Sequence, residues 1–286
     1  MVFGRSILHG RAVLIALGLA GLLGFAGCGL GEALVVDVQI GGLGGSGARA
    51  GWGQLVSWVD IRVLDSNGVL RGQGALAPQG DYWKGSVGVE VSGLMTFIAT
   101  AGASTGEVQW IGSSNLNVSS SGLSLTIGVT APAVGDEGPA RGVVFYDKGS
   151  YTDGWRYLEA SPSDQSSAAS WSNGTTYLTT GANNVEIGSG SANTQSITTS
   201  QGTGTYAASL CANLTYGGFR DWFLPSRDEL YALYSAHLTN ASLSSSAYWS
   251  SSEKDQYWTY RVHLGTGART DQIKSEPCRV RAIRKF

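Results

Sequence analysis

Short apolar stretches that alternate residue by residue run through residues 34–130 and constrain the fold more than any other feature. The stretches at 34–40, 59–63, 87–91, 95–101 and 123–129 place an apolar residue at every second position. A period of two is typical of a half-buried β-strand, and the Gly, Ser, Asn and Asp residues between the stretches favour turns. About seven short strands in about 100 residues, with no helical pattern, predict an all-β immunoglobulin-like sandwich over residues 34–130.

Composition excludes several other protein classes. The chain of 286 residues has 42 Gly, 6 Pro and only 14% charged residues. Gly without a three-residue period excludes collagen, and a hydrophobic share of 42% argues against disorder. The net charge of −2 gives no electrostatic basis for binding nucleic acid, so we expect no nucleic-acid partner.

The N-terminus has the pattern of an export signal. Arg5 and Arg11 precede an uncharged apolar run at residues 12–25, which is shorter than the roughly 20 residues of a membrane span. Small residues and then Cys28 follow, so we predict a signal peptide over residues 1–27. An uncleaved anchor, or an ordinary signal peptide that happens to precede a cysteine, remains an alternative.

The end of this signal resembles the bacterial lipobox, although Phe25 stands where Leu is usual. The resemblance implies acylation of Cys28, a lipidated tether over residues 28–33, and membrane attachment through the lipid. Gly29 after the cysteine favours the bacterial outer membrane, with exposure at the cell surface as a further hypothesis.

Two cysteines remain after lipidation, Cys211 and Cys278. In an exported protein, two thiols are most simply one disulfide. A zinc site would need more ligands than two isolated cysteines offer. We therefore predict a disulfide between Cys211 and Cys278.

The second half of the chain has a mixed pattern. A Pro- and Gly-containing linker at residues 131–140 precedes a domain at 141–286, which opens with a strand at 142–146. A loop rich in Ser, Thr, Gly and Asn runs through residues 161–204, and a short helix over 206–214 carries Cys211.

A capped helix follows this loop. Ser226 and Glu229 form a capping box, and Leu230, Leu233 and His237 continue one apolar helix face. Strands are expected at 257–264 and at 278–284. The pattern predicts an α+β domain.

Several runs in this domain carry a family resemblance. They are GVVFYD at 142–147, IGSGSANT at 187–194, DWFLPS at 221–226, YWSSSE at 248–253 and RVRAIR at 279–284. In this order they resemble the Lcl C-terminal domain family, named for the tip of a bacterial collagen-like adhesin. The resemblance implies a C-type-lectin-like fold related to formylglycine-generating enzymes, in which a disulfide from a helix to the last strand is common.

Candidate ligand-binding residues are the aromatic and basic side chains late in the chain. Residues 28–138 have 4 basic and 9 acidic residues, whereas those from 139 onward have 13 and 12. Tyr and Trp can stack on sugar rings, and a basic patch can bind sulfated glycans, but core packing and a charged sheet edge explain the same residues as well. The candidates are Trp249, Trp258, Tyr260, Arg261, Arg269, Lys274, Arg279 and Arg281.

Catalytic and metal-binding patterns are missing from the sequence. His237 and His263 lie in no nucleophile or metal motif. We therefore expect no catalytic residue, no metal and no cofactor.

Three functional hypotheses follow. The first is a surface-anchored lipoprotein that binds glycan or host matrix through its C-terminal domain. The second is a structural or assembly lipoprotein that contacts other envelope proteins. The third, an unrecognised hydrolase, would need a cleft holding a His or paired carboxylates.

Overall fold

The computed structural model describes residues 33–41, 56–79, 82–174 and 177–286. The predicted signal peptide at 1–27, the lipidation of Cys28 and all but the last residue of the tether lie outside these residues. None of the described helices is long and apolar enough to cross a membrane.

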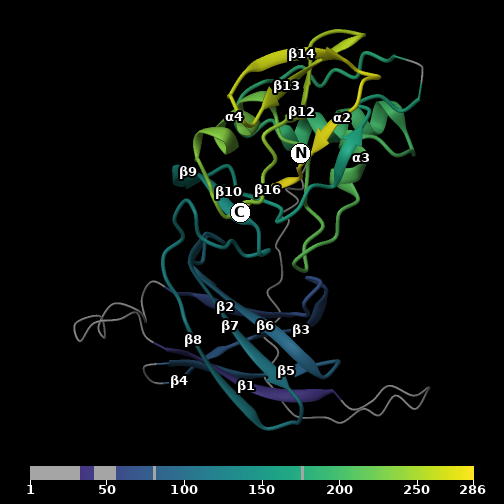
Figure 1. Cartoon of the computed structure of the whole chain (residues 1–286). Coiled ribbons are helices and arrows are strands. Elements are labelled where there is room, and N and C mark those ends of the chain that lie inside the picture. Colours follow the sequence, from purple (N-terminus) through teal and green to yellow (C-terminus); the bar gives the residue numbers. More distant parts are fainter. Residues whose placement is uncertain (1–32, 42–55, 80–81, 175–176) are drawn as a thin grey trace, which may run out of the picture. The chain divides into compact units, whose positions relative to one another are not determined.

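The first part of the described chain consists of two four-stranded sheets (Figure 1). One sheet has the order β4-β5-β1-β8 and the other has the order β3-β2-β6-β7. The strands confirm the all-β character predicted for residues 34–130. They are β1 (Leu34–Gly41), β2 (Trp58–Leu64), β3 (Leu70–Ala75), β4 (Ala77–Gln79), β5 (Tyr82–Val89), β6 (Gly93–Gly102), β7 (Val108–Val118) and β8 (Leu123–Gly128).

One apolar core lies between these two sheets. Val36 and Val38 of β1 enter it from the first sheet, and Ile61 of β2 and Phe97 of β6 enter it from the second. Each of these four side chains is at most 2% exposed. The alternation in the sequence therefore marks the inner face of each sheet, because successive side chains of a strand point to opposite faces.

The second part of the chain contains two more sheets and three described helices. The sheet orders are β16-β10-β9 and β11-β15-β12-β13-β14. The elements are β9 (Val143–Thr152), β10 (Trp155–Ala160), β11 (Ser166–Ala169), α2 (Gly190–Gln201), α3 (Ala207–Ala212), α4 (Arg227–Ser235), β12 (Ala247–Glu253), β13 (Trp258–His263), β14 (Arg269–Ile273), β15 (Cys278–Val280) and β16 (Ile283–Lys285).

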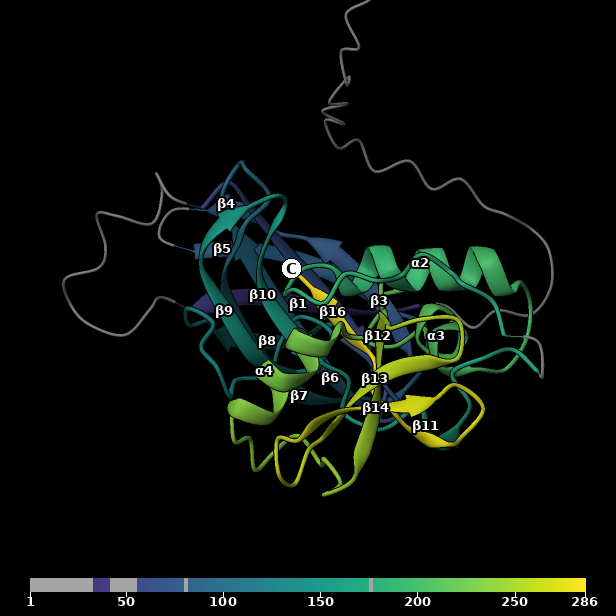
Figure 2. The same ribbon diagram turned by 90° about the horizontal axis from the view of Figure 1, so that it is seen from above.

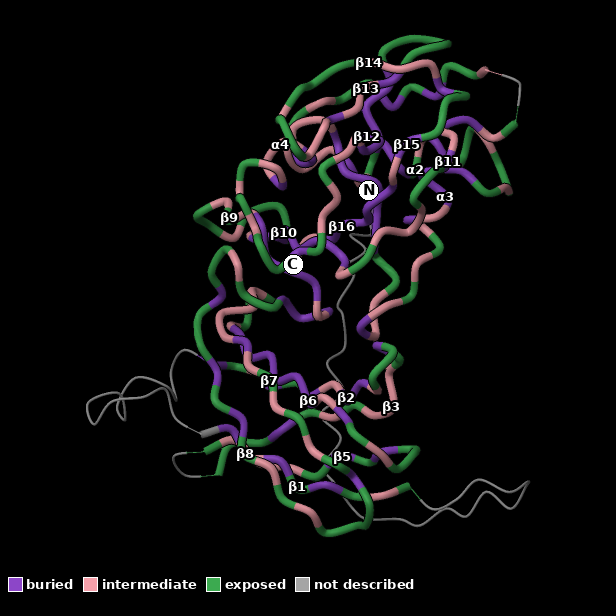
Figure 3. Tube along the Cα trace, viewed as in Figure 1, coloured by how far each residue is buried: buried purple, intermediate pink, exposed green. Residues whose placement is uncertain are grey.

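Strand β12 is the centre of this second part, and helices lie on both of its sides (Figure 2). Trp249 packs into a core with Ile197 of α2 and Ala208 of α3. Its neighbour Tyr248 points the other way, into a core with Leu230 of α4. Figure 3 shows that the chain is buried along β12. This strand separates the two cores.

Helix α2 lies inside the segment that the sequence predicts to be a loop, so the prediction of a continuous loop over 161–204 is wrong. Its buried face consists of Gly190, Asn193, Thr194 and Ile197, which have helical spacing but are mostly polar. Thr194 Oγ1 accepts the Leu224 N–H at 3.0 Å and donates to the Leu224 carbonyl at 3.2 Å. Hydrogen bonds take the place of apolar contacts on this face, and a search for apolar periodicity overlooks such a helix.

The predicted capping box at the start of α4 is confirmed. Ser226 Oγ accepts the Glu229 N–H, and Glu229 Oε2 accepts the Ser226 N–H at 2.7 Å. Glu229 Oε1 also accepts the Gly188 N–H at 2.8 Å. The Glu229 carboxylate is fully buried, so it ties the segment before α2 to the start of α4. Burial raises the pKa of Glu229, and the amides that donate to it oppose this shift.

Two element boundaries differ from the predictions. Helix α4 ends at Ser235, and His237 follows it with a left-handed φ of 49°, outside the helix face on which it was expected. The predicted last strand at 278–284 is two strands in two different sheets, because the chain turns between Val280 and Ile283.

Replacing Gly190 tests how closely α2 packs against the start of α4. A Cβ atom at Gly190 would overlap Glu229 Oε2 and lie 2.8 Å from the Ser226 nitrogen. We expect Gly190→Ala to lower the free energy of unfolding by about 1–3 kcal/mol through overpacking, although Ala favours helix. Urea unfolding measures this change.

Gly128→Ala is the matched control for this variant. Nothing lies within 4 Å of a Cβ at Gly128, so we expect a change within about 0.5 kcal/mol. A Gly190→Ala protein as stable as the control would show that α2 does not lie against Glu229.

Candidate functional site

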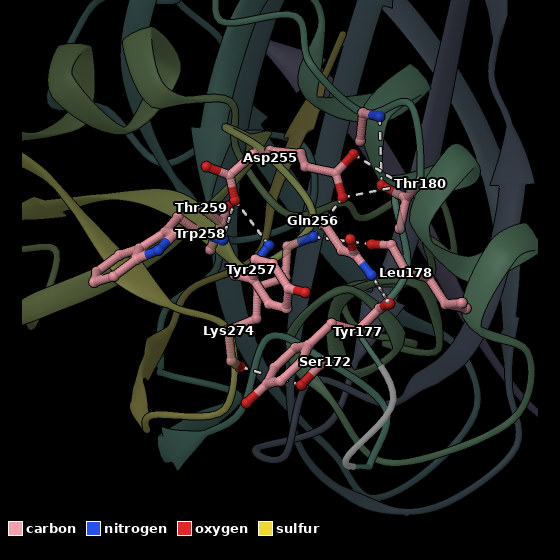
Figure 4. A network of polar contacts seen from close by, with 12 residues as sticks. Ser172, Tyr177, Leu178, Thr180, Asp255, Gln256, Tyr257, Trp258, Thr259 and Lys274 are labelled. Atoms are coloured by element: carbon pink, nitrogen blue, oxygen red, sulfur yellow. Dashed lines mark hydrogen bonds and ion pairs between the residues drawn. The ribbon is translucent and has the colours of Figure 1, made fainter.

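A buried ion pair organises the second part of the chain around the β12–β13 turn (Figure 4). Lys274 Nζ lies 2.5 Å from Glu253 Oε1, with the two side chains 0% and 3% exposed. Lys274 Nζ also donates to the Leu178 carbonyl at 3.0 Å. The Glu253 carboxylate in turn accepts the N–H groups of Thr180 and Gly181, with Oε2 at 2.9 and 3.0 Å.

These contacts hold the irregular residues 171–174 and 177–182 against the strands. Trp171 and Ser172 each donate a backbone N–H to the Lys274 carbonyl, and the Trp171 ring lies 4.6 Å from Lys274 Nζ. A buried ion pair adds little net stability because both charges lose water. The main effect of Lys274 and Glu253 is therefore to fix the path of this segment.

The β12–β13 turn presents two exposed aromatic side chains. Asp255 Oδ1 accepts the N–H groups of Tyr257 at 2.8 Å and Trp258 at 2.9 Å, which closes the turn. These two hydrogen bonds to its carboxylate lower the pKa of Asp255. Tyr257 is 50% and Trp258 40% exposed, and the two rings point to different sides of the turn (Figure 4).

Trp258 and Tyr260 share one face of β13 with Val262. Val262 is buried against Leu230 and Leu233 of α4. Tyr260 is half-buried and Trp258 is exposed, so α4 covers only one end of the face. We call the uncovered end, with Trp258 and Tyr260, the open face.

Charged side chains border the open face. The Arg227 guanidinium lies 5.3 Å from the centre of the Tyr260 ring and pairs with Asp228 at 2.9 Å. Arg269 lies 4.3 Å from the Tyr231 ring on α4. Two further charges come from an ion pair between Lys254, the first residue of the turn, and Asp271 of β14, which lies opposite Tyr260.

This arrangement suits binding by stacking and hydrogen bonding. Residues i and i+2 of a strand lie about 7 Å apart on one face, so Trp258 and Tyr260 offer two neighbouring rings. Aromatic rings have an apolar face and, in Tyr and Trp, a polar edge group. Guanidinium and ammonium groups beside them can donate to oxygen-rich ligands.

The structure brings together three of the predicted ligand-binding residues and separates the other five. Trp258, Tyr260 and Arg269 project from the same face of β13 and β14, because Val262 pairs with Arg269. Arg261 projects from the opposite face, where its Nε donates to Thr270 Oγ1 at 3.1 Å. Arg279 pairs with Asp164 at 2.9 Å, away from the open face.

Three of the predicted ligand-binding residues are buried, which corrects their assignment to a surface. Trp249 is 0% exposed and its Nε1 donates to the Ala169 carbonyl at 2.7 Å. Lys274 belongs to the ion pair described above. Arg281 is 1% exposed and donates to Asp164 and to the carbonyls of Ser161, Ala241 and Ser242.

The predicted disulfide is also absent from the structure. Cys211 on α3 and Cys278 on β15 are free, and both thiols are buried. Cys278 Sγ lies 3.9 Å from Arg261 Nη1. Desolvation raises the pKa of the Cys211 thiol and that of the Cys278 thiol, which suits thiols that pack as small apolar side chains.

Sequence reasoning missed two charged residues of the site. Arg227 is the first residue of α4 and Lys254 follows the last residue of β12. The capping box marked where α4 starts, so it could have placed Arg227 at that end. The position of Arg227 beside Tyr260, however, depends on tertiary packing, which local sequence patterns do not show.

No group of three His, Cys, Asp or Glu side chains that could hold a metal ion occurs among the described residues. The groups at the open face are aromatic rings and the ion pairs Arg227–Asp228 and Lys254–Asp271.

Breaking the buried ion pair should destabilise the domain strongly. We expect Lys274→Met to lower the free energy of unfolding by about 3–5 kcal/mol, because it leaves the Glu253 carboxylate buried without its cation. The double variant Glu253→Gln with Lys274→Met should lose less than the sum of the two single changes. Urea unfolding of the four proteins gives the coupling energy, and strictly additive effects would contradict the ion pair.

The turn that carries the two aromatic side chains should respond to acid. Asp255 has a lowered pKa, so its support of the turn is present above the ordinary value of 3.8 and is lost as the pH falls through the lower pKa of the folded protein. We expect a carboxyl NMR titration to place Asp255 below 3.8. In Asp255→Asn, the Tyr257 and Trp258 amide signals should no longer follow that titration; a pKa at or above 3.8 would rule out this turn.

Comparison with known proteins gives several solved structures with limited likeness, two of which are a fimbrial protein and a fimbrial assembly protein. A fimbrial protein from Bacteroides ovatus matches over 89% of this chain and 71% of its own, with 12% identity and a TM-score of 0.41. A fimbrial assembly protein from Parabacteroides distasonis matches over 35% of this chain and 52% of its own, with 10% identity and a TM-score of 0.25. None of the curated proteins matches this chain.

The sequence of the second part matches a known family. The matched residues include the open face, α2, α3 and α4, and the segment held by Lys274 and Glu253. Residues 162–284 match the model of the Lcl C-terminal domain family, which confirms the resemblance that the sequence motifs indicate for this part of the chain.

Proposed function

We propose that this protein is a non-enzymatic, surface-anchored lipoprotein that binds a glycan or an extracellular-matrix ligand through its C-terminal domain. The observation that carries the proposal is the open face, where the exposed Trp258 and the half-buried Tyr260 lie beside Arg227 and Lys254. Trp and Tyr side chains are enriched in binding interfaces.

The domain organisation supports this proposal. The lipobox-like sequence before Cys28 suggests an anchor at the outer membrane. We propose that residues 34–130 are an immunoglobulin-like spacer and that residues 141–286, after the linker at 131–140, are a lectin-like binding domain. The match to the Lcl C-terminal domain family supports the second assignment.

The contacts of the two histidines of the C-terminal domain support a non-enzymatic role. His263 Nδ1 accepts the Gly265 N–H at 3.1 Å. The His237 ring packs edge-on against Tyr234 with centroids 5.6 Å apart. Both imidazoles have structural contacts, and we assign neither to catalysis.

A second candidate function is contact with another envelope protein. The side of the β12–β13 turn opposite Trp258 carries Tyr257, whose ring meets that of Tyr177 at 5.6 Å, and Leu178 is 40% exposed nearby. Small apolar patches of this kind also occur in protein–protein interfaces. This patch favours an assembly role.

Binding to immobilised glycans and matrix proteins tests the two candidates. We expect the protein without residues 1–27 to bind saturably, and Trp258→Ala to weaken the affinity at least about tenfold, which is about 1.4 kcal/mol. Tyr257→Ala is the matched control, because Tyr257 is a similarly exposed aromatic residue on the other side of the turn. It should bind like the unmodified protein.

Two results would contradict the proposal. One is the absence of saturable binding across neutral and sulfated glycans and matrix proteins. The other is loss of binding in Tyr257→Ala with full binding in Trp258→Ala. Recovery of a stoichiometric envelope protein with the lipoprotein, abolished by Tyr257→Ala, would establish the assembly role instead.

A further inference from the structure

A groove separate from the open face lies between α3 and the loop before β11. It has a volume of about 450 Å³ and is lined by Ser163, Asp164, Gln165, Thr205, Leu210 and Asn213, among others. This volume falls within the range of about 300–1,000 Å³ for small-molecule sites. We call it the α3 groove.

One wall of the α3 groove is held rigidly. Asp164 Oδ1 accepts Arg281 Nε at 2.7 Å, and Oδ2 accepts Arg279 Nη1 at 2.9 Å and the Tyr248 hydroxyl at 3.0 Å. Gln165 Nε2 donates to Ser161 Oγ at 3.1 Å, and its Oε1 accepts the Ala282 N–H. A wall fixed before binding lowers the entropy cost of holding a ligand.

The opposite wall combines an apolar strip with small polar groups. Leu210 and Leu214 are half-buried, whereas Thr205 and Asn213 are exposed. Ser163 and Thr215 are also exposed on the rim. These hydroxyl and amide groups can both donate and accept hydrogen bonds.

The charged side chains of the groove lining indicate which class of ligand it can bind. Asp164 is the only charged side chain among the described lining residues, and it is paired with the guanidinium groups of Arg279 and Arg281, which lie outside the lining. An ionic ligand would therefore find no unpaired opposite charge in the lining. A ligand with an apolar face and several hydroxyl groups could pack against Leu210 and Leu214 and form hydrogen bonds with the polar rim.

We propose that the α3 groove binds a neutral sugar unit, as a second site independent of the open face. The ring of the sugar lies against Leu210 and Leu214. Its hydroxyl groups exchange hydrogen bonds with Asn213, Thr205 and Ser163. The inference rests on the groove alone and does not depend on the function proposed above.

Saturation-transfer NMR on the protein without residues 1–27 tests this site. The probes are neutral methyl glycosides of glucose, galactose, mannose and N-acetylglucosamine, with glucuronic acid and a sulfated monosaccharide as charged probes. We expect at least one neutral glycoside to bind with a millimolar Kd and the charged probes to bind at least tenfold more weakly.

Two variants test whether the neutral glycoside binds in the α3 groove. Thr205→Tyr places a large side chain at an exposed position of the groove and should weaken the neutral glycoside at least tenfold. Thr126→Tyr makes the same change at an exposed position of β8, outside the groove, and should leave binding unchanged. Trp258→Ala should also leave it unchanged, which separates this site from the open face.

Three outcomes would overturn the proposal. They are no transfer to any neutral glycoside at high millimolar concentration, equal or tighter binding of the charged probes, and binding that survives Thr205→Tyr in a protein whose amide spectrum shows an intact fold. Loss of binding in Trp258→Ala with full binding in Thr205→Tyr would assign the sugar to the open face.

Discussion

The ion pair between Glu253 and Lys274 is the interaction on which the loop-rich second part of the chain depends. It joins the end of β12 to the residue after β14 and draws in the backbone at Leu178, Thr180 and Gly181. A segment with so little regular structure cannot satisfy its backbone groups through its own helix or sheet. The two buried charges supply those partners, and the position of the β12–β13 turn follows from them.

Charged side chains also hold together other parts of the second half of the chain, including two of the sequence motifs that carry the family resemblance. Arg284 of the RVRAIR run bonds to Glu159 at 2.6 Å and to Asp221 of the DWFLPS run at 2.8 Å. The Glu229 carboxylate likewise accepts the backbone N–H groups of Gly188 and Ser226. Charged residues in and beside the motifs thus anchor the fold, whereas Trp258 and Tyr260 of the open face lie between the motifs.

The extent to which the sequence predicted the structure differs between the two parts. Period-two alternation identified β1, β2, β6, β8 and the end of β5 in the first part, since one face of each sheet is buried, but it did not identify β3, β4 or β7. In the second part the capping box at Ser226 and Glu229 was predictable from local spacing, but α2 was not, because Asn193 and Thr194 occupy its buried face. At the site, Trp258 and Tyr260 could be placed on one face, whereas the burial of Lys274 and Arg281 depends on partners far away in the chain.

The last two strands have a consequence for how the second part of the chain is closed. Strand β15 pairs with β11 and lies parallel to β12. Strand β16 pairs with β10, more than 100 residues earlier in the sequence. Contacts of such long range slow folding, because the loops between them must close first. Without residues 278–285, Glu159 would lack the cation of Arg284 and both sheets would be incomplete. One short segment at the end of the described chain therefore completes both sheets.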